Sequence, residues 1–428
     1  MPVICKKIGS VPSNTKKSIV LVVVSYVCAL GLAMPLPAAA QRWKSIATLN
    51  GVEGTWKRIC VTPKTGGWVK AKPECTYYTQ ISSGISHACG VTVTGGAKCW
   101  GRNWYNTGTG EFSALGDGTM TLSTIPVDVV GLQSGVRSIF AGDSNSCALT
   151  TSGAVKCWGY NRIGQLGNDT ITNSMAPVDV VGLESGVSSI SGGYDNQVCA
   201  LKNNTPYCWG GGYGKTPMEI TSLKAQVAQL SSGRAHVCVV TISGEGLCWG
   251  NNQGGLLGDG DTINSWKWTP GKVAIAEKLS SISAGADHTC AVTQSGALYC
   301  WGLNDRGQLG DGTTIDHRLP ALVSGLSSGV SAVDTMAYQF TCALMTVGTV
   351  KCWGSNQDGA LGIGNQADFS IPVDVLKLTG VVQLDVGNRN VCAVTRQNVG
   401  YCWGFNMVGG VGAGDAKFLY TTPKLVTP

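Results

Sequence analysis

The sequence predicts an all-β protein, a seven-bladed β-propeller built from four-stranded blades. A Cys-Trp-Gly triplet occurs seven times in the 428 residues, and a second cysteine stands nine or ten positions before each triplet. The chain contains 60 glycines but only six phenylalanines, and 13% of its residues are charged, a composition typical of turn-rich β-sheet proteins. Four short strands repeated seven times at about 50 residues are typical of a propeller.

Each repeat contains a predicted β-hairpin that ends at its Cys-Trp-Gly triplet. In the second repeat, opposing Cys147 to Cys157 leaves a three-residue loop whose last residue is Gly153. A loop of this length favours a left-handed conformation at its last position. The third repeat is one residue shorter, so we expect it to turn through Asn203 and Asn204. The other loops end at Gly95, Gly244, Gly296, Gly348 and Asn398, residues that tolerate this conformation.

The two cysteines of each hairpin are expected to form a cross-strand disulfide, because opposed residues of an antiparallel pair lie about 4.5–5.5 Å apart at Cα. A zinc site is the alternative, but the sequence has no Cys-x2-Cys knuckle, and ligands opposed on a two-stranded ladder leave no second pair nearby. One further pair is expected before the repeats. The predicted pairs are Cys60–Cys75, Cys89–Cys99, Cys147–Cys157, Cys199–Cys208, Cys238–Cys248, Cys290–Cys300, Cys342–Cys352 and Cys392–Cys402.

Two more strands complete each predicted blade. One precedes the hairpin, as at residues 187–193. The other is expected to begin at a proline and to lie at a sheet edge, where a missing N–H is tolerated. No such strand precedes the first hairpin, whereas a spare one begins at Pro423 after the last. We therefore expect the two ends of the repeat region to combine in one blade, so that the C-terminal strand closes the ring. The internal prolines are Pro126, Pro177, Pro217, Pro270, Pro320 and Pro372.

Residues 1–40 are similar to an export signal. Four lysines surround the start of the segment, residues 19–34 are almost entirely apolar, and residues 38–40 are alanines that suit cleavage. The apolar run is shorter than the roughly 20 residues that cross a bilayer, so cleavage is favoured over a retained short membrane anchor. Complete pairing of the remaining cysteines requires an oxidising compartment. The protein is therefore expected to be extracellular, at the cell surface or periplasmic.

Residues 41–77 are expected to form a basic, disulfide-stapled hairpin before the propeller of residues 78–428. They hold seven Lys or Arg and two Glu, whereas the propeller region is mildly acidic. The basic patch is either solvated or attaches to an acidic partner such as an envelope polymer. No nucleic-acid partner is predicted, and a membrane is a partner only if the N-terminal segment is not cleaved.

The loops that follow the Cys-Trp-Gly triplets are similar to a known repeat. The pattern Gly-x-Asn-x-x-Gly-Gln-Leu-Gly occurs at residues 159–167 and 302–310, and with one change at 250–258 and 354–362. The first copy is expanded, and the third is shortened to residues 210–216. Residues 78–428 therefore resemble the regulator of chromosome condensation repeat family, in particular secreted bacterial members such as the β-lactamase inhibitory propellers.

This resemblance implies a seven-bladed propeller that works by binding proteins. The family's nuclear member is a guanine-nucleotide exchange factor, but the export signal and paired cysteines argue against that role here. A plant member senses ultraviolet light through clustered tryptophans, whereas the triplet tryptophans occur once per repeat, which indicates packing between blades. We expect a non-catalytic binding or adhesion module for a protein or an envelope polymer. A secreted inhibitor of an enzyme is the alternative, and a hydrolase on a propeller scaffold is disfavoured.

The four histidines do not predict catalysis. His87, His236 and His288 each stand two residues before a hairpin's first cysteine, where other repeats have Asn, Gln or Phe. A position that accepts those residues has a structural role. His317 is a lone loop residue.

No cofactor or metal ion is predicted. Residues 214–216 are Gly-Lys-Thr, but Trp209 occupies the position where a phosphate loop requires an earlier glycine. The Gly-Asp-Gly loops offer one or two carboxylates each, the most at Asp259 and Asp261. Calcium takes six to eight oxygens, so turns are the better interpretation of these loops.

The loops between Cys-Trp-Gly and the next proline strand are the expected binding surface. In a propeller all seven emerge on one face, and loops on a rigid scaffold commonly carry binding. These loops are rich in aromatic residues, which dominate protein-binding hot spots unless they pack beneath their own loops. Trp266 and Trp268 alternate with Lys267, so in an extended segment both rings point the same way. The candidates are Trp104, Tyr105, Phe112, Tyr160, Tyr213, Trp266, Trp268, Phe369, Phe405, Phe418 and Tyr420.

Overall fold

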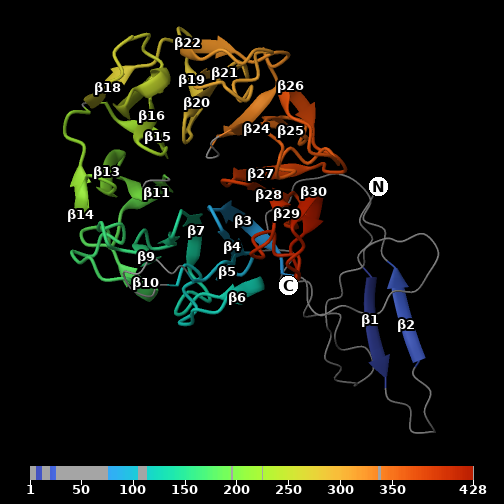
Figure 1. Ribbon diagram of the computed structural model, residues 1–428. Helices are drawn as coiled ribbons and strands as arrows, with labels where there is room; N and C mark the ends of the chain where they lie inside the picture. The colour runs from blue at the N-terminus through green and yellow to red at the C-terminus, as the bar shows by residue number, and fades with distance from the viewer. Residues whose placement is uncertain are drawn as a thin grey trace. The chain divides into compact units, whose positions relative to one another are not determined.

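The computed structural model describes residues 6–11, 20–25, 76–104, 113–193, 196–223, 225–335 and 339–427. Residues Tyr77–Thr427 form one unit, in which seven four-stranded antiparallel sheets stand around a ring (Figure 1). The prediction of an all-β, seven-bladed propeller is confirmed. In a separate N-terminal unit, β1 (Lys6–Val11) pairs antiparallel with β2 (Val20–Ser25). Among the described residues, none lies in a helix long and apolar enough to cross a membrane.

Each blade consists of four consecutive strands, numbered from the ring centre outward (Figure 1). The first strands are β3 (Tyr78–Ser83), β7 (Val136–Ala141), β11 (Val187–Gly192), β15 (Val227–Ser232), β19 (Leu279–Ala284), β23 (Val330–Asp334) and β27 (Val381–Val386). The second strands are β4 (His87–Thr92), β8 (Asn145–Thr150), β12 (Gln197–Lys202), β16 (His236–Thr241), β20 (His288–Thr293), β24 (Phe340–Met345) and β28 (Asn390–Thr395).

The third strands end at or just after the Cys-Trp-Gly triplets, and the fourth lie at the rim. The third strands are β5 (Ala97–Gly101), β9 (Val155–Gly159), β13 (Thr205–Gly210), β17 (Gly246–Asn251), β21 (Leu298–Gly302), β25 (Val350–Gly354) and β29 (Gly400–Phe405). The fourth strands are β6 (Ser123–Asp128), β10 (Ser174–Asp179), β14 (Gly214–Glu219), β18 (Trp266–Lys272), β22 (His317–Leu322), β26 (Phe369–Asp374) and β30 (Leu419–Leu425). One 3-10 turn, η1 (Gln253–Gly255), lies in the loop after β17.

The predicted hairpins have the expected register and turn conformations. Cys147 opposes Cys157 in β8 and β9, and Gly153 has a φ of 83° at the end of the three-residue loop. In the shortened third repeat, Asn203 and Asn204 adopt left-handed φ values of 50° and 63°. Asn and Gly adopt the left-handed backbone conformation at little cost in free energy. The turn residues therefore suit the loop length that the register of each hairpin requires.

All seven predicted hairpin disulfides are present, one in each blade. The paired Cα atoms lie 4.0–4.2 Å apart, closer than the spacing expected from the sequence. All fourteen of these cysteines are fully buried. The predicted pair of Cys60 and Cys75 lies outside the described residues.

The proline strands are edge strands, as expected, but they do not begin at their prolines. In β10 the strand starts three residues before Pro177, and its register against β9 shifts between Ser174 and Val178. The proline therefore lies within an irregular stretch on the outer edge, where its missing N–H interrupts no ladder. The other six edge strands also start three or four residues before the proline.

The expected sharing of one blade between the two chain ends is wrong. The first blade contains β3 to β6 and the last contains β27 to β30, so both are complete without strand exchange. The repeating unit starts at the innermost strand and ends with the proline strand that follows the hairpin. The proline strand at Pro423 therefore completes the last blade's own sheet.

The ring closes instead through side chains that join the first strands of neighbouring blades. The Gln383 amide donates to Ile81 O at 2.8 Å and accepts from Ile81 N at 3.1 Å, which joins β27 to β3. Gln80 makes the same two bonds to Ile139, and Gln229 makes them to Ile282. The closing junction is therefore bonded like two junctions inside the ring.

Candidate binding face

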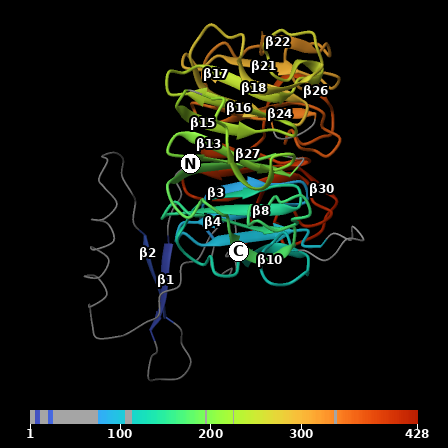
Figure 2. The same cartoon turned by 90° about the vertical axis from the view of Figure 1, so that its left-hand side faces the viewer.

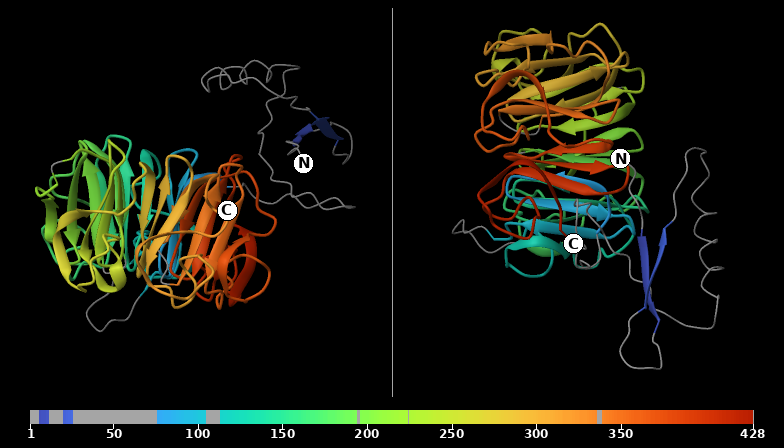
Figure 3. Two further views of the ribbon diagram at one scale, coloured as in Figure 1. Left: turned by 90° about the horizontal axis from the view of Figure 1, so that it is seen from above. Right: turned by 90° about the vertical axis from the view of Figure 1, so that its right-hand side faces the viewer.

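The loops between third and fourth strands leave every blade on one face, because strand direction alternates in the same order in each sheet. We call this the loop face; the side views in Figures 2 and 3 show loops on both faces of the disc. The opposite face carries the hairpin turns. The long connections whose lengths vary from blade to blade lie on the loop face, between the third and fourth strands.

A buried asparagine holds each long loop in shape. Asn161 accepts a bond from Leu166 N at 2.9 Å, and its amide donates to Thr170 O and Thr172 O. These bonds satisfy backbone groups that would otherwise lack partners in a turn. The same side chain is fully buried in six blades, at Asn103, Asn161, Asn252, Asn304, Asn356 and Asn406. The shortened loop of the third blade has no equivalent residue.

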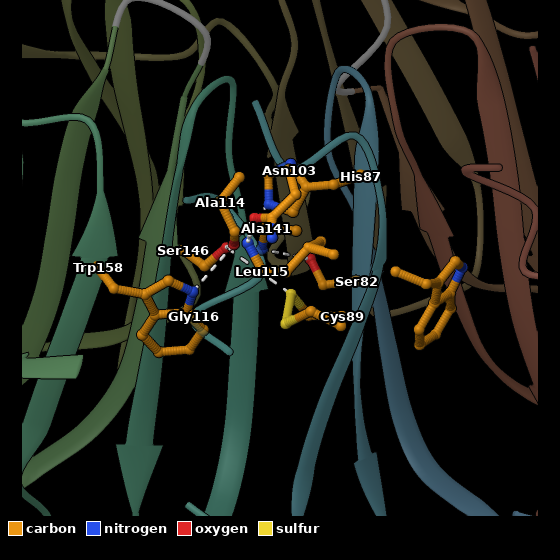
Figure 4. The surroundings of a disulfide bond; sticks show 12 residues. Ser82, His87, Cys89, Asn103, Ala114, Leu115, Gly116, Ala141, Ser146 and Trp158 are labelled. Atoms are coloured by element: carbon orange, nitrogen blue, oxygen red, sulfur yellow. Dashed lines mark hydrogen bonds between the residues drawn. A yellow bond between two sulfur atoms is a disulfide. The ribbon is translucent and has the colours of Figure 1, made fainter. Parts of the chain in front are cut away.

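The triplet tryptophans connect each blade to the blade before it. Trp158 Nε1 donates to Ala114 O at 2.9 Å, and the indole is fully buried (Figure 4). The loop needs a glycine at position 116, because a Cβ on Gly116 would lie 2.6 Å from Trp158 Nε1. The packing role expected for these tryptophans is confirmed. The other bonds to backbone carbonyls are Trp100 to Gly410, Trp209 to Gln165, Trp301 to Leu256, Trp353 to Gln308 and Trp403 to Ala360.

Trp249 lacks such a carbonyl because the preceding blade has the shortened loop. Its Nε1 donates to the hydroxyl of Tyr213 at 3.0 Å. Tyr213 is 8% exposed, and burial raises the pKa of its hydroxyl. This candidate from the sequence is therefore mainly a packing residue of the junction between the third and fourth blades.

Trp266 and Trp268 form an exposed aromatic pair at the start of β18. Their ring centroids lie 5.1 Å apart, and the side chains are 40% and 61% exposed. Trp268 also meets the edge of Tyr213 at 6.4 Å, so the pair extends over the neighbouring blade. Trp268 therefore covers the shortened loop of the third blade and still presents most of its surface.

Lys267 points to carboxylates of its own loop and holds the strand start in place. Its Nζ lies 2.6 Å from Asp259 and 2.8 Å from Asp261. These carboxylates raise the pKa of Lys267, and the bond to Lys267 lowers that of Asp261. The Gly-Asp-Gly loop that contains Asp259 and Asp261 therefore holds the Lys267 ammonium between its two carboxylates.

A second aromatic pair lies in the last blade. Phe405 and Phe418 pack edge to face at 5.6 Å, and Phe418 is 54% exposed. The guanidinium of Arg389 lies 3.9 Å above the Phe405 ring and binds both oxygens of Asp358. Arg389 and Asp358 were not candidates from the sequence, because they belong to different blades and share no motif.

The remaining aromatic candidates differ in exposure. Trp104 is 49% exposed, and Tyr160 and Phe369 are half-buried. Tyr420 is buried and donates to Asp415 at 2.6 Å; burial and this carboxylate raise its pKa to about 12. Tyr105 and Phe112 lie outside the described residues.

Comparison with known proteins identifies the repeat. Two family models, both described as "Regulator of chromosome condensation (RCC1) repeat", match the chain: one matches residues 136–165 and 279–308, and the other residues 152–200, 243–292, 295–344 and 348–394. The ultraviolet-B receptor UVR8 of Arabidopsis thaliana is 32% identical over 363 residues, which cover 83% of this chain and 73% of the receptor. The chain belongs to the RCC1 repeat family.

Other RCC1-repeat proteins agree with this assignment. The mitochondrial RCC1 domain-containing protein RUG3 of Arabidopsis thaliana is 25% identical, covering 74% of this chain and 76% of the relative. Yeast RCC1 (Prp20), solved with bound Kap60, has a TM-score of 0.67 and 20% identity over 87% of this chain and 91% of its own, which shows a shared fold. By its name UVR8 is a receptor, and yeast RCC1 was solved with Kap60 bound to it.

Three histidines of this RCC1-repeat propeller occupy equivalent positions between blades. His87 Nε2 lies 2.8 Å from Ser146 Oγ (Figure 4), His236 Nε2 2.8 Å from Thr289 Oγ1, and His288 Nε2 2.7 Å from Thr341 Oγ1. Complete burial lowers their pKa to about 4 for His87 and His236 and to about 3 for His288. Their second-strand positions and buried neighbours agree with the structural role expected from the sequence.

His317, the fourth histidine, pairs with Asp311 of a Gly-Asp-Gly loop. His317 Nε2 lies 2.9 Å from Asp311 Oδ2, and Asp311 also accepts bonds from Thr313. Within the described part of the chain, no three His, Cys, Asp or Glu side chains are grouped as metal ligands.

Two carboxylates at the inner strands were not singled out from the sequence. Asp385 accepts a bond from Ser83 N, and Asp334 accepts one from Val386 N at 2.8 Å, each across a blade junction. Burial and the neighbouring Asp334 raise the pKa of Asp385 well above its usual range. At the equivalent positions Ser82 and Ser231 bond the next blade, so this site is a charged variant of a repeated contact.

Proposed function

We propose that this protein is a non-catalytic binding module that recognises a protein or an envelope polymer through the loop face. The observation that carries the proposal is the pair Trp266 and Trp268. The seven triplet tryptophans bond within the ring, whereas these two indoles lie outside the triplets and remain 40% and 61% exposed on a strand that Lys267 fixes. Exposed, rigidly held tryptophans are typical hot-spot residues.

Membership of the RCC1 repeat family supports a binding role. Yeast RCC1 binds Kap60 in its solved complex, and UVR8 is named a receptor. The described loop face supports the same class of function, because its histidines and carboxylates are paired within the scaffold. A protein partner is therefore the first candidate and an envelope polymer the second.

We further propose that the protein is exported and acts outside the cytoplasm. Seven fully buried disulfides are consistent with folding in an oxidising compartment. The apolar residues 19–34 after four lysines supply a signal for export, and basic residues 41–77 supply an attachment patch for an acidic envelope polymer.

The test is a comparison of the native protein with the double variant Trp266→Ala/Trp268→Ala. Tagged protein is incubated with the envelope fraction of the producing cell, and the retained partner is then titrated with each variant. We expect the double variant to lose binding by about 2 kcal/mol or more, with little change in melting temperature. Val347→Ala is the matched control, since Val347 is exposed on the opposite face.

Two results would contradict the proposal. A double variant that melts earlier but binds normally would show that the tryptophans only pack. Equal loss of binding in Val347→Ala would place the binding surface on the hairpin face. A soluble enzyme as the retained partner would support the inhibitor alternative within the same binding class.

A further inference from the structure

A cavity of about 340 Å³ lies between the last two blades on the loop face. One wall comes from the loop after β25 and the other from the turn between β27 and β28. Pockets of this size hold small ligands or single units of larger ones. The lining residues are Gln339, Phe340, Ser355, Gln357, Asp358, Ala360, Asn388 and Arg389.

The charged wall of the cavity is rigid and neutral. Arg389 Nε and Nη2 donate to the two oxygens of Asp358 at 2.7 and 2.6 Å, a bidentate pair that connects the two blades. The stacked ring of Phe405 holds the guanidinium from below. Because one carboxylate balances one guanidinium, the wall offers directed hydrogen bonds without net charge.

The rest of the lining is made of amides and a hydroxyl that have no internal partner. Among the described residues, the side chains of Gln339, Ser355, Gln357 and Asn388 make no hydrogen bond. Together they offer both donors and acceptors. Elsewhere on the loop face, some comparable side chains are bonded within their own loops: Asn168 accepts from Thr170 Oγ1, and Asn365 accepts from Ala367 N.

From this lining we infer that the cavity binds a neutral saccharide unit. A sugar presents hydroxyl donors and acceptors in several directions, which suits three amides, one hydroxyl and a fixed ion pair. Phe340 and Ala360 supply a small apolar floor for its C–H groups. An anionic or cationic ligand would meet a charge that is already balanced by Arg389 or Asp358. This site is separate from the tryptophan pair and does not depend on it.

The test uses N-acetylglucosamine, glucose and glucuronate as probes in saturation-transfer NMR with the folded propeller. We expect transfer to a neutral sugar, and at least a tenfold weaker Kd in the variant Asn388→Ala/Gln357→Ala. These two side chains have no internal partner, so the melting temperature should not change. Gln397→Ala is the matched control, because Gln397 is an exposed amide of the same blade on the opposite face.

Three results would overturn the inference. The first is no saturation transfer to either neutral sugar at 20 mM, a concentration chosen to detect affinities down to the order of 10⁻² M. The second is equal saturation transfer to the sugar from native protein and from the double variant. The third is preferred binding of glucuronate, which would mean that Arg389 acts as a free cation. Arg389→Lys would then be expected to reduce that binding, since it loses the bidentate geometry.

Discussion

The hydroxyl of Tyr213 accepts a hydrogen bond from Trp249 Nε1 at 3.0 Å, where the other six blade junctions use a backbone carbonyl. The loop of the third blade is too short to supply the carbonyl. One side chain therefore replaces a missing piece of backbone, and the ring keeps seven equivalent contacts.

The variant Tyr213→Phe should destabilise the propeller by about 1–3 kcal/mol, because it leaves a buried indole N–H without an acceptor. Chemical denaturation measures the change. Tyr207→Phe is the control, since Tyr207 bonds Glu219 at the surface and should cost less than Tyr213→Phe. Equal stability of Tyr213→Phe and native protein would show that the contact is not needed.

The closing junction should be as strong as a junction inside the ring. Gln383→Ala removes two bonds to Ile81 between the last and first blades, and Gln229→Ala removes the same two bonds to Ile282. We expect equal losses of roughly 1–3 kcal/mol in the free energy of unfolding, because each variant leaves the same two backbone groups unpaired. A clearly larger loss for Gln383→Ala would identify the closure as the weak point.

The three buried histidines should make the propeller sensitive to acid. Their pKa values are lowered by burial, to about 4 for His87 and His236 and about 3 for His288. As the pH falls below 6.5, the unfolded chain gains protons that the folded chain does not, so stability decreases down to the folded pKa. A shift from 6.5 to about 4 corresponds to about 3 kcal/mol for each histidine at pH 4.

This pH dependence is measured as the slope of the unfolding free energy between pH 7 and pH 4. His87→Asn should reduce the slope, because the next blade already has Asn145 at that position. Asn145→His is the reciprocal variant and should increase it. An unchanged slope in both variants would show that other groups cause the acid sensitivity.

Asp385 should have the opposite dependence. Its pKa is raised by burial and by Asp334, so its protonated form is stabilised in the folded chain. That contribution is present below the unfolded pKa of about 4 and is lost as the pH rises through the folded pKa, at about 1.4 kcal/mol for each pKa unit. Asp385→Asn should therefore stabilise the propeller above the native pKa, with a flatter pH profile.

The control for Asp385→Asn is Asp374→Asn at the rim. Asp374 is exposed and pairs with Lys351 at 2.8 Å, a surface ion pair that contributes about 0–1 kcal/mol. Thermal unfolding between pH 4 and pH 8 separates the two. If Asp385→Asn and native protein had parallel profiles, the carboxylate would be solvated in the folded state.

The sequence was sufficient to predict the cysteine hairpins, which depend only on local spacing. The loop length between Cys147 and Cys157 and the glycine at 153 determined the register, the turn and the disulfide together. The strand at which each blade begins could not be predicted from local spacing, because a repeating sequence can be divided at any point. Only the pairing of strands shows that Pro423 completes its own blade, so the predicted closure was wrong.

The candidate site was predictable from the sequence only where its geometry depends on a single strand and not on contacts between blades. The alternation of Trp266 and Trp268 about Lys267 placed both indoles on one side of β18. Burial was not predictable, since Tyr213 is covered by residues that depend on how the third and fourth blades meet. The pair of Arg389 and Asp358 joins residues 31 positions apart in different blades, and neither belongs to a repeated motif.

The order of the cysteines has a consequence for biosynthesis. Each of the seven disulfides joins a cysteine to the next one along the chain, nine or ten residues later. A chain that emerges from its N-terminus into an oxidant exposes each correct pair before the following cysteine appears. The native set can therefore form in sequence, one hairpin after another, without an isomerase to shuffle wrong pairs.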